Sequence, residues 1–119
     1  MKVENLLVKS KISEKNLVHD VSFEVRKGEI VCIAGIDGNG QSELVYALTG
    51  MVPAHHGKIF MNSKDITHAT IRKRSLAGMS HIPEDRHKHG LVLDYTLSEN
   101  LILQTYFTSK FSKHGFLKF

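Results

Sequence analysis

The chain has 119 residues, of which 41% are apolar and 24% are charged, and its formal net charge is +4. These values fit one ordinary globular domain. The longest apolar runs have only a few residues, which excludes both a membrane-spanning helix of about 20 residues and a secretory signal. Three of the four net charges are lysines in the last nineteen residues. Since the rest of the chain is nearly neutral, we expect no direct contact with nucleic acid.

The first third of the chain has the pattern of a β-rich region. Partly alternating apolar residues over 3–8 and 18–25 predict two strands. Residues 29–34 form a short, continuous apolar run with β-branched side chains, which predicts a strand covered on both faces. Cys32, the single cysteine, lies in this run and is expected to be inert core.

A glycine-rich segment follows the third expected strand. Gly35 and Gly40 have the spacing of the phosphate-binding loop, Gly-x4-Gly-Lys-Ser/Thr, and Ser42 is present, but Gln41 stands at the lysine position. Apolar residues then recur at helical spacing, and Gly50 ends the predicted helix. Residues 40–50 are therefore expected to be the helix of a phosphate loop.

The chemistry of such a loop explains its residue types. Successive backbone N–H groups and the positive end of a helix surround phosphate oxygens, and side chains would block their approach. Gln41 offers a neutral amide instead of an ammonium, so nucleotide affinity should fall by about one to two orders of magnitude. The candidate nucleotide-binding residues are Gly35, Asp37, Gly38, Asn39, Gly40, Gln41, Ser42 and Glu43.

The middle of the chain predicts short elements. A hairpin is expected over 57–66 around Asn62-Ser63-Lys64, and a short surface helix over 70–77, stopped by Gly78. Residues 79–82 are expected to form a further strand, which Pro83 stops. Within the helix, the run Arg72-Lys73-Arg74 is interpreted as a solvated face.

Three segments together resemble ATP-binding cassette (ABC) transporter ATPases. They are VSFEVRKGEIVCIAGIDGNGQSELVYALTG, HGKIFMNSKDI and GMSHIPEDRHKHGLVLDYTLSENLIL, in that order. GNGQSEL in place of GAGKST, together with PEDR, resembles the second, C-terminal cassette of the ATP-binding subunits of simple-sugar and nucleoside importers. The resemblance runs from about Val3 to at least Leu103.

The resemblance implies a fold and a set of site residues. The fold would be α/β, a partial P-loop NTPase core with an antiparallel β subdomain. Ser42 and Glu84 would bind Mg²⁺ beside ATP, and Pro83, Glu84, Asp85 and Arg86 would form a coupling loop. Around Ile12 to Asn16, where the family places an aromatic that stacks on adenine, there is none, so base stacking is not expected.

The resemblance also implies partners and a location. The subunit would act with transmembrane permease subunits and a second ATP-binding cassette, without inserting into the membrane. It would be cytoplasmic, peripheral at the inner face of the cell membrane. ATP binding would be coupled to solute import in the full protein.

Several family elements are expected downstream and are missing here. Leu97-Ser98-Glu99-Asn100 imitates the LSGGQ signature, but Thr96 and Glu99 form a capping box that explains these residues better. Leu91 to Asp94 imitates the metal-binding strand but follows Ile82 too soon for a crossover helix. The chain is thus expected to be a partial domain that ends before the Walker B strand and is inactive alone.

The partial domain divides into expected regions. Residues 1–34 and 57–82 would be mainly β, residues 40–50 the phosphate-loop helix, and residues 96–119 the start of a helical subdomain. The tail holds five of the nine aromatic residues and no acid, so exposure or association is expected from Tyr106 to Phe119.

Two alternatives from other classes remain. The chain could belong to a non-transport ABC protein that acts on the ribosome or nucleic acid, or it could be an interaction domain that never binds nucleotide. The eight histidines, including His55-His56 and His87 with His89, lack the spacing of a ligand set and are interpreted as surface loop residues.

Overall fold

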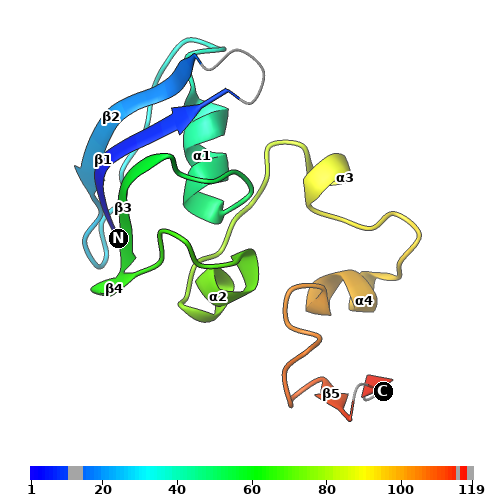
Figure 1. Ribbon diagram of the computed structural model, residues 1–119. Coiled ribbons are helices and arrows are strands. Elements are labelled where there is room, and N and C mark those ends of the chain that lie inside the picture. The colour runs from blue at the N-terminus through cyan, green and yellow to red at the C-terminus, as the bar shows by residue number, and fades with distance from the viewer. Residues whose placement is uncertain (11–14, 115, 118–119) are drawn as a thin grey trace. The chain divides into compact units, whose positions relative to one another are not determined.

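The computed structural model describes residues 1–10, 15–114 and 116–117. The chain divides into two compact units, Met1–Met79 and Ser80–Phe119. In the described residues, the first unit holds a four-stranded antiparallel sheet and two helices, and the second holds two short helices and a small strand pair (Figure 1). The glycine loop belongs to the first unit.

The sheet of the first unit contains the two strands predicted at the start of the chain and the predicted hairpin. Its strands are β1 (Lys2–Lys9), β2 (Asn16–Glu24), β3 (His56–Met61) and β4 (Lys64–Asp65). Their order is β2-β1-β3-β4, and every neighbouring pair is antiparallel. The strand predictions over 3–8 and 18–25 and the hairpin are confirmed.

Irregularities in the pairing of β1 with β2 keep the apolar residues of β1 on one face. Val3 and Leu6 are three residues apart, a spacing that would place them on opposite faces of a regular strand. An irregularity between them, with Asn5 at φ 47°, brings both into the core. Asp20 of β2 has φ 51°, and its Oδ1 accepts a hydrogen bond of 2.8 Å from Asn5 Nδ2. These irregularities explain why the alternation in the sequence is only partial.

Helix α1 (Gln41–Thr49) packs against β1 and β2 and closes the core. Figure 1 shows α1 lying along one face of the sheet. The helix ends at Gly50, which has φ 87° and whose N–H donates to Ala47 O, as its position in the sequence predicts. The buried apolar side chains are Val3, Leu6, Val8, Val18, Leu44, Ala47, Leu48, Ile59 and Ile66.

Arg74 joins the end of α1 to the segment after the hairpin. It lies on α2 (Ile71–Leu76), and only 3% of its surface is exposed. Nη1 donates to Ala47 O (2.9 Å) and Leu48 O (2.6 Å). Nη2 donates to Thr67 O (2.8 Å), and Nε donates to Ala69 O (3.0 Å).

The placement of Arg74 corrects one prediction and confirms another. The helix over 70–77 is confirmed, with Thr70 as its N-cap. The interpretation of the whole run 72–74 as solvated is wrong at Arg74, because the last carbonyls of α1 need donors and the guanidinium supplies them. Burial lowers the pKa of the guanidinium, which stays charged at neutral pH.

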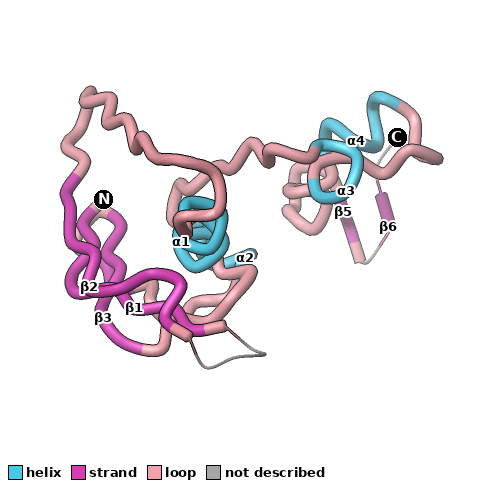
Figure 2. Tube along the Cα trace, turned by 90° about the horizontal axis from the view of Figure 1, so that it is seen from above, coloured by secondary structure: helices cyan, strands magenta, loops and turns pink. Residues whose placement is uncertain are grey.

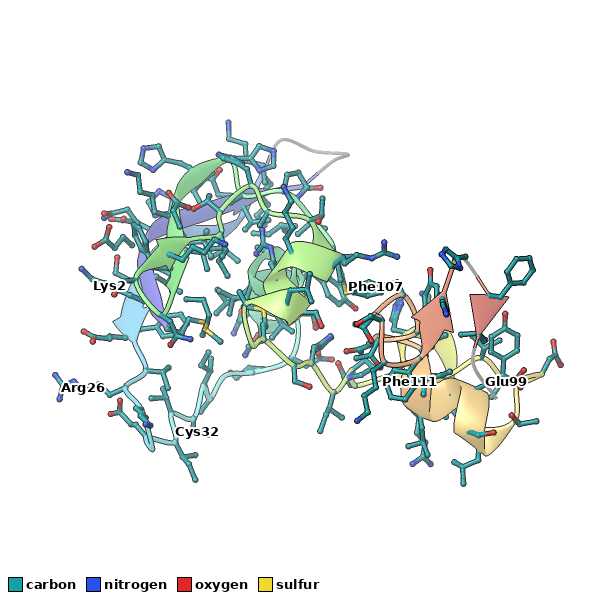
Figure 3. All side chains as sticks on the ribbon, turned by 90° about the horizontal axis from the view of Figure 1, so that it is seen from below. Lys2, Arg26, Cys32, Glu99, Phe107 and Phe111 are labelled. Atoms are coloured by element: carbon teal, nitrogen blue, oxygen red, sulfur yellow. The ribbon has the colours of Figure 1, made fainter. Side chains whose placement is uncertain are left out.

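Two predicted strands are absent. Residues 29–34 are loop rather than a covered strand, as Figure 2 shows for the whole path from β2 to α1. Ile30 is 96% exposed, and Cys32, predicted to be core, is exposed at the margin of the unit in Figure 3. Residues 79–82 are also loop, with Ile82 93% exposed. A strand forms only when its backbone pairs with a neighbour, and among the described residues none pairs with either segment. Within residues 57–82, strand structure therefore ends with β4 at Asp65, so this region is not mainly β.

The second unit is built from short elements. Its helices are α3 (Arg86–His89) and α4 (Leu97–Ile102), and its strands are β5 (Ser112–Lys113) and β6 (Phe116–Leu117). The predicted capping box is confirmed, since Thr96 Oγ1 accepts from Glu99 N and Glu99 Oε2 accepts from Thr96 N. The tail after α4 is mostly turns, so the predicted start of a helical subdomain is limited to α4.

Asn100 holds together the segment that resembles the signature and metal-binding motifs. Its Oδ1 accepts from Val92 N (2.9 Å), and its Nδ2 donates to the carbonyls of Val92, Tyr95 and Thr96. The side chain thus closes the loop in front of α4. Residues 91–94 are loop rather than strand. This confirms that residues 91–94 and 97–100 have structural roles and are not the metal-binding strand and the signature of the family.

Replacing Arg74 should destabilise the first unit strongly. Arg74→Met removes the donors for four backbone carbonyls, two of them at the end of α1, and hydrogen bonds to a charged group are strong. The free energy of unfolding should fall by about 2–4 kcal/mol, as measured by urea denaturation. Lys73→Met is the matched control on the same helix, with an expected loss below about 0.5 kcal/mol. Equal losses in both variants would contradict the role of Arg74.

The hairpin turn offers a stabilising change. Asn62 and Ser63 have φ 49° and 64°, the conformation of a two-residue type I′ turn, which favours Asn-Gly. Ser63→Gly should therefore raise the free energy of unfolding by about 0.5–1 kcal/mol, because glycine adopts a positive φ without strain. Ser63→Ala removes the hydroxyl but keeps the strain and should give no gain. An equal gain from alanine would show that backbone strain is not the cause.

Candidate functional site

The glycine loop runs from Gly35 into α1, and two of its glycines have backbone angles that favour glycine. Gly38 has φ 81°, and Gly40, the N-cap of α1, has φ 93°. A Cβ on Gly40 would lie 2.3 Å from Leu17 O, so Gly40 packs directly on the backbone of β2. Gly40 therefore holds the end of the loop against the sheet, whereas a Cβ on Gly38 would meet nothing within 4 Å.

The first turn of α1 presents backbone donors. Leu44 N donates to Gly40 O at 2.9 Å, which is the first hydrogen bond of the helix. The N–H groups of Gln41, Ser42 and Glu43 precede it and have no intrahelical acceptor, and Gly40 supplies no side-chain cap. The helix dipole adds partial positive charge at this end. The geometry of the loop fits an anionic group such as a phosphate.

Gln41 folds back over the loop, which sequence reasoning did not anticipate. Its Nε2 donates to Ile36 O at 3.2 Å. A Cβ on Gly35 would lie 1.8 Å from the same Nε2, so the amide rests directly on Gly35. The amide donor at the lysine position is therefore engaged within the loop. No sequence signal reveals this contact, because it depends on the path of residues 35–40.

The predicted nucleotide-binding residues lie together at one end of α1. Gly35, Asp37, Gly38, Asn39 and Ser42 are exposed, Gln41 and Glu43 are half-buried, and Gly40 is buried. The loop is thus open to solvent along most of its length. Of the adenine-stacking region that the resemblance implies, Ile12 and the two residues after it lie outside the described residues.

The predicted coupling loop belongs to the second unit. Asp85 is the N-cap of α3, and its Oδ1 accepts hydrogen bonds of 3.0 Å from both His87 N and Lys88 N. Glu84 is exposed and Pro83 is half-buried. Asp85 therefore has a structural role, while the carboxylate of Glu84 faces solvent. Ser42 and Glu84 lie in different units, and their joint Mg²⁺ site stays a prediction.

Within the described residues, no three histidine, cysteine, aspartate or glutamate side chains are grouped so that they could hold a metal ion. Nor does any helix there have the length and apolar character needed to cross a membrane.

Comparison with known proteins identifies relatives. The family described as "ABC transporter" matches residues 18–115. The guanosine import ATP-binding protein NupO of Bacillus subtilis is 52% identical over 100 residues, covering 84% of this chain and 20% of that protein. The nucleoside import ATP-binding protein NupA of Lactococcus lactis is 51% identical over 102 residues, covering 86% of this chain and 20% of that protein.

A more distant relative matches almost the whole chain. The ribose import ATP-binding protein RbsA of Rhodococcus jostii is 33% identical over 117 residues, covering 98% of this chain and 22% of that protein. The chain spans about a fifth of the length of these relatives. The family match, the antiparallel sheet and the glycine loop at the start of α1 agree with the resemblance found in the sequence. The chain belongs to the ABC transporter family, and its relatives include ATP-binding proteins for nucleoside and ribose import.

Proposed function

We propose that this chain is part of the ATP-binding subunit of an importer for a nucleoside or sugar, in the position of the second cassette, and that its glycine loop binds the phosphates of ATP. The observation that carries the proposal is the loop itself. Gly38 and Gly40 have positive φ, and the first turn of α1 has uncapped N–H groups. Backbone donors at a helix N-terminus are the usual ligands of phosphate.

Gln41 makes the proposed site a weak one. Its amide is neutral and donates to Ile36 O in the described conformation, so a phosphate must either bind without it or displace that hydrogen bond. The backbone donors and the hydroxyl of Ser42 remain. Binding without the ammonium loses about 1.5–3 kcal/mol of charge-assisted hydrogen bonding. The site is therefore suited to nucleotide binding and regulation rather than rapid phosphoryl transfer, which depends on charge stabilisation.

Mg²⁺ would be held by oxygen ligands that the chain can supply. The hydroxyl of Ser42, next to the phosphate-binding N–H groups, is exposed, as is the carboxylate of Glu84. Both are hard oxygen donors that suit Mg²⁺. When bound, Mg²⁺ would neutralise part of the charge on the β- and γ-phosphates. This role of Glu84 differs from that of Asp85, whose carboxylate caps α3.

The names of the relatives support a set of proposed partners. NupO, NupA and RbsA are named as ATP-binding proteins of import systems. We expect the intact subunit to work with transmembrane permease subunits and a second ATP-binding cassette at the inner face of the cell membrane. The segment Pro83–Arg86 would contact the permease and report the state of the nucleotide. The chain alone is expected to hydrolyse ATP negligibly.

Titration with Mg-ATP tests nucleotide binding at the loop. In the ¹⁵N-labelled chain, the amide signals of Gly38, Gly40 and Ser42 should shift in a saturable way, because their N–H groups would donate to phosphate. Signals of β3 should stay unchanged. A loop that does not respond at millimolar nucleotide would support the interaction-domain alternative and overturn the proposal. Salt-dependent shifts with RNA but not ATP would instead support a role on nucleic acid.

Variants at Gln41 test the role assigned to its side chain. Gln41→Lys restores an ammonium and should tighten the apparent Kd for Mg-ATP by about 10- to 100-fold. Gln41→Glu places a negative charge near the phosphates and should abolish binding. Gln41→Met is the matched neutral control, with a change of less than about threefold, since the amide is engaged by Ile36 O. If lysine and methionine gave the same Kd, the phosphates would not lie beside residue 41.

A further inference from the structure

A groove separates the β3–β4 hairpin from α2 in the first unit. Its volume is about 710 Å³. The floor and walls include Met61 from β3, Ala69 from the connecting loop, and Leu76 and Ala77 from α2 and its C-cap. Met61, Ala69 and Ala77 also pack against the core, whereas Leu76 is 64% exposed. The groove therefore presents an apolar surface that is continuous with the core.

Cationic side chains border this apolar surface. Lys64 lies on the hairpin side of the groove and Lys73 on the α2 side, and both are exposed. His68 lines the groove from the connection between them. Among the described residues, neither lysine forms an ion pair with a carboxylate. The ion pair found among these residues joins Lys2 to Glu4, outside the groove. Each wall thus contributes an ammonium with no anionic partner in this part of the chain.

Asp65 is the acidic residue that lines the groove, and its carboxylate is already engaged. Its Oδ1 accepts hydrogen bonds from Thr67 N (2.9 Å) and Thr67 Oγ1 (2.6 Å). These two bonds lower the pKa of Asp65, so the group stays ionised and fixed to Thr67 at neutral pH. The groove lining therefore carries two ammonium groups against one carboxylate that is held by Thr67, so its balance of charge is positive.

We infer that this groove docks an acidic amphipathic segment of a protein partner. The apolar side chains of the partner would contact Met61 and Leu76, and its carboxylates would lie beside Lys64 and Lys73. The charges are complementary, and an apolar centre with a polar rim is the usual anatomy of a protein interface. A small ligand would need a cavity that encloses most of its surface, whereas Leu76 and both lysines here are exposed. None of these residues belongs to the glycine loop, so the inference does not depend on nucleotide binding.

The first experiment compares two peptides on the full ¹⁵N-labelled chain. One is a synthetic amphipathic helix of about twelve residues with leucines on one face and glutamates beside them, and the other has lysine in place of each glutamate. The acidic peptide should shift the amide signals of Lys64, Ala69, Lys73 and Leu76 in a saturable way. The basic peptide should not. Equal binding of both peptides would overturn the inference.

Charge-reversal variants locate the contact. Lys64→Glu and Lys73→Glu should each weaken the apparent Kd of the acidic peptide by about five- to tenfold, because reversal removes attraction and adds repulsion. Leu76→Ser should weaken binding by about threefold or more. Lys27→Glu is the matched control: it makes the same charge change on an exposed lysine outside the groove, and it should leave the Kd within about twofold.

Other occupants of the groove give distinct results. An equal effect of Lys27→Glu would indicate general attraction to a basic chain and would overturn the inference. Concentration-dependent shifts of Lys73 and Leu76 in the chain without peptide would identify a second copy as the occupant. Binding to phosphatidylglycerol vesicles that is lost in Lys73→Glu, without binding of the acidic peptide, would identify a lipid surface. Either of these last two results would overturn the inference that the partner is an acidic protein segment.

Discussion

The first unit depends on the buried guanidinium of Arg74. A helix leaves its last carbonyls without intrahelical donors, and the end of α1 is buried, where unsatisfied carbonyls are costly. Arg74 donates to two of these carbonyls and to two more in the segment after the hairpin. Its positive charge also complements the negative end of the helix dipole. The one side chain therefore fixes α1 to α2 and to the connection that leaves the sheet.

This contact constrains the residues around it. Gly50 has φ 87°, and a Cβ there would lie 2.9 Å from Arg74 Nε. A glycine is needed both for the turn that ends α1 and for the approach of the guanidinium. At the other end of the same helix, Gly40 packs on Leu17 O. The position of the glycine loop is thus determined by both ends of α1, one against β2 and the other against Arg74.

Local sequence patterns predicted the elements whose stability comes from nearby residues. The capping box of Thr96 and Glu99, the turn at Asn62 and Ser63, and helix α1 with its terminal glycine were all predictable. Residues 29–34 and 79–82 were not, because a continuous apolar run indicates a strand only if other segments pair with it. The burial of Arg74 also depends on distant carbonyls, and a run of basic residues gives no sign of them.

The candidate site likewise has features that the sequence predicts and others that it does not. The spacing of Gly35, Gly40 and Ser42 predicted a loop before a helix, and the structure has one, but the spacing could not predict that Gln41 would donate to Ile36 O. That contact links the helix start to the part of the loop that no strand supports. Gln41 therefore affects phosphate binding in two ways: it removes a positive charge, and its amide can reach a phosphate only if the hydrogen bond to Ile36 O breaks. Both effects lower the affinity, so the backbone N–H groups at the start of α1 must supply most of the binding.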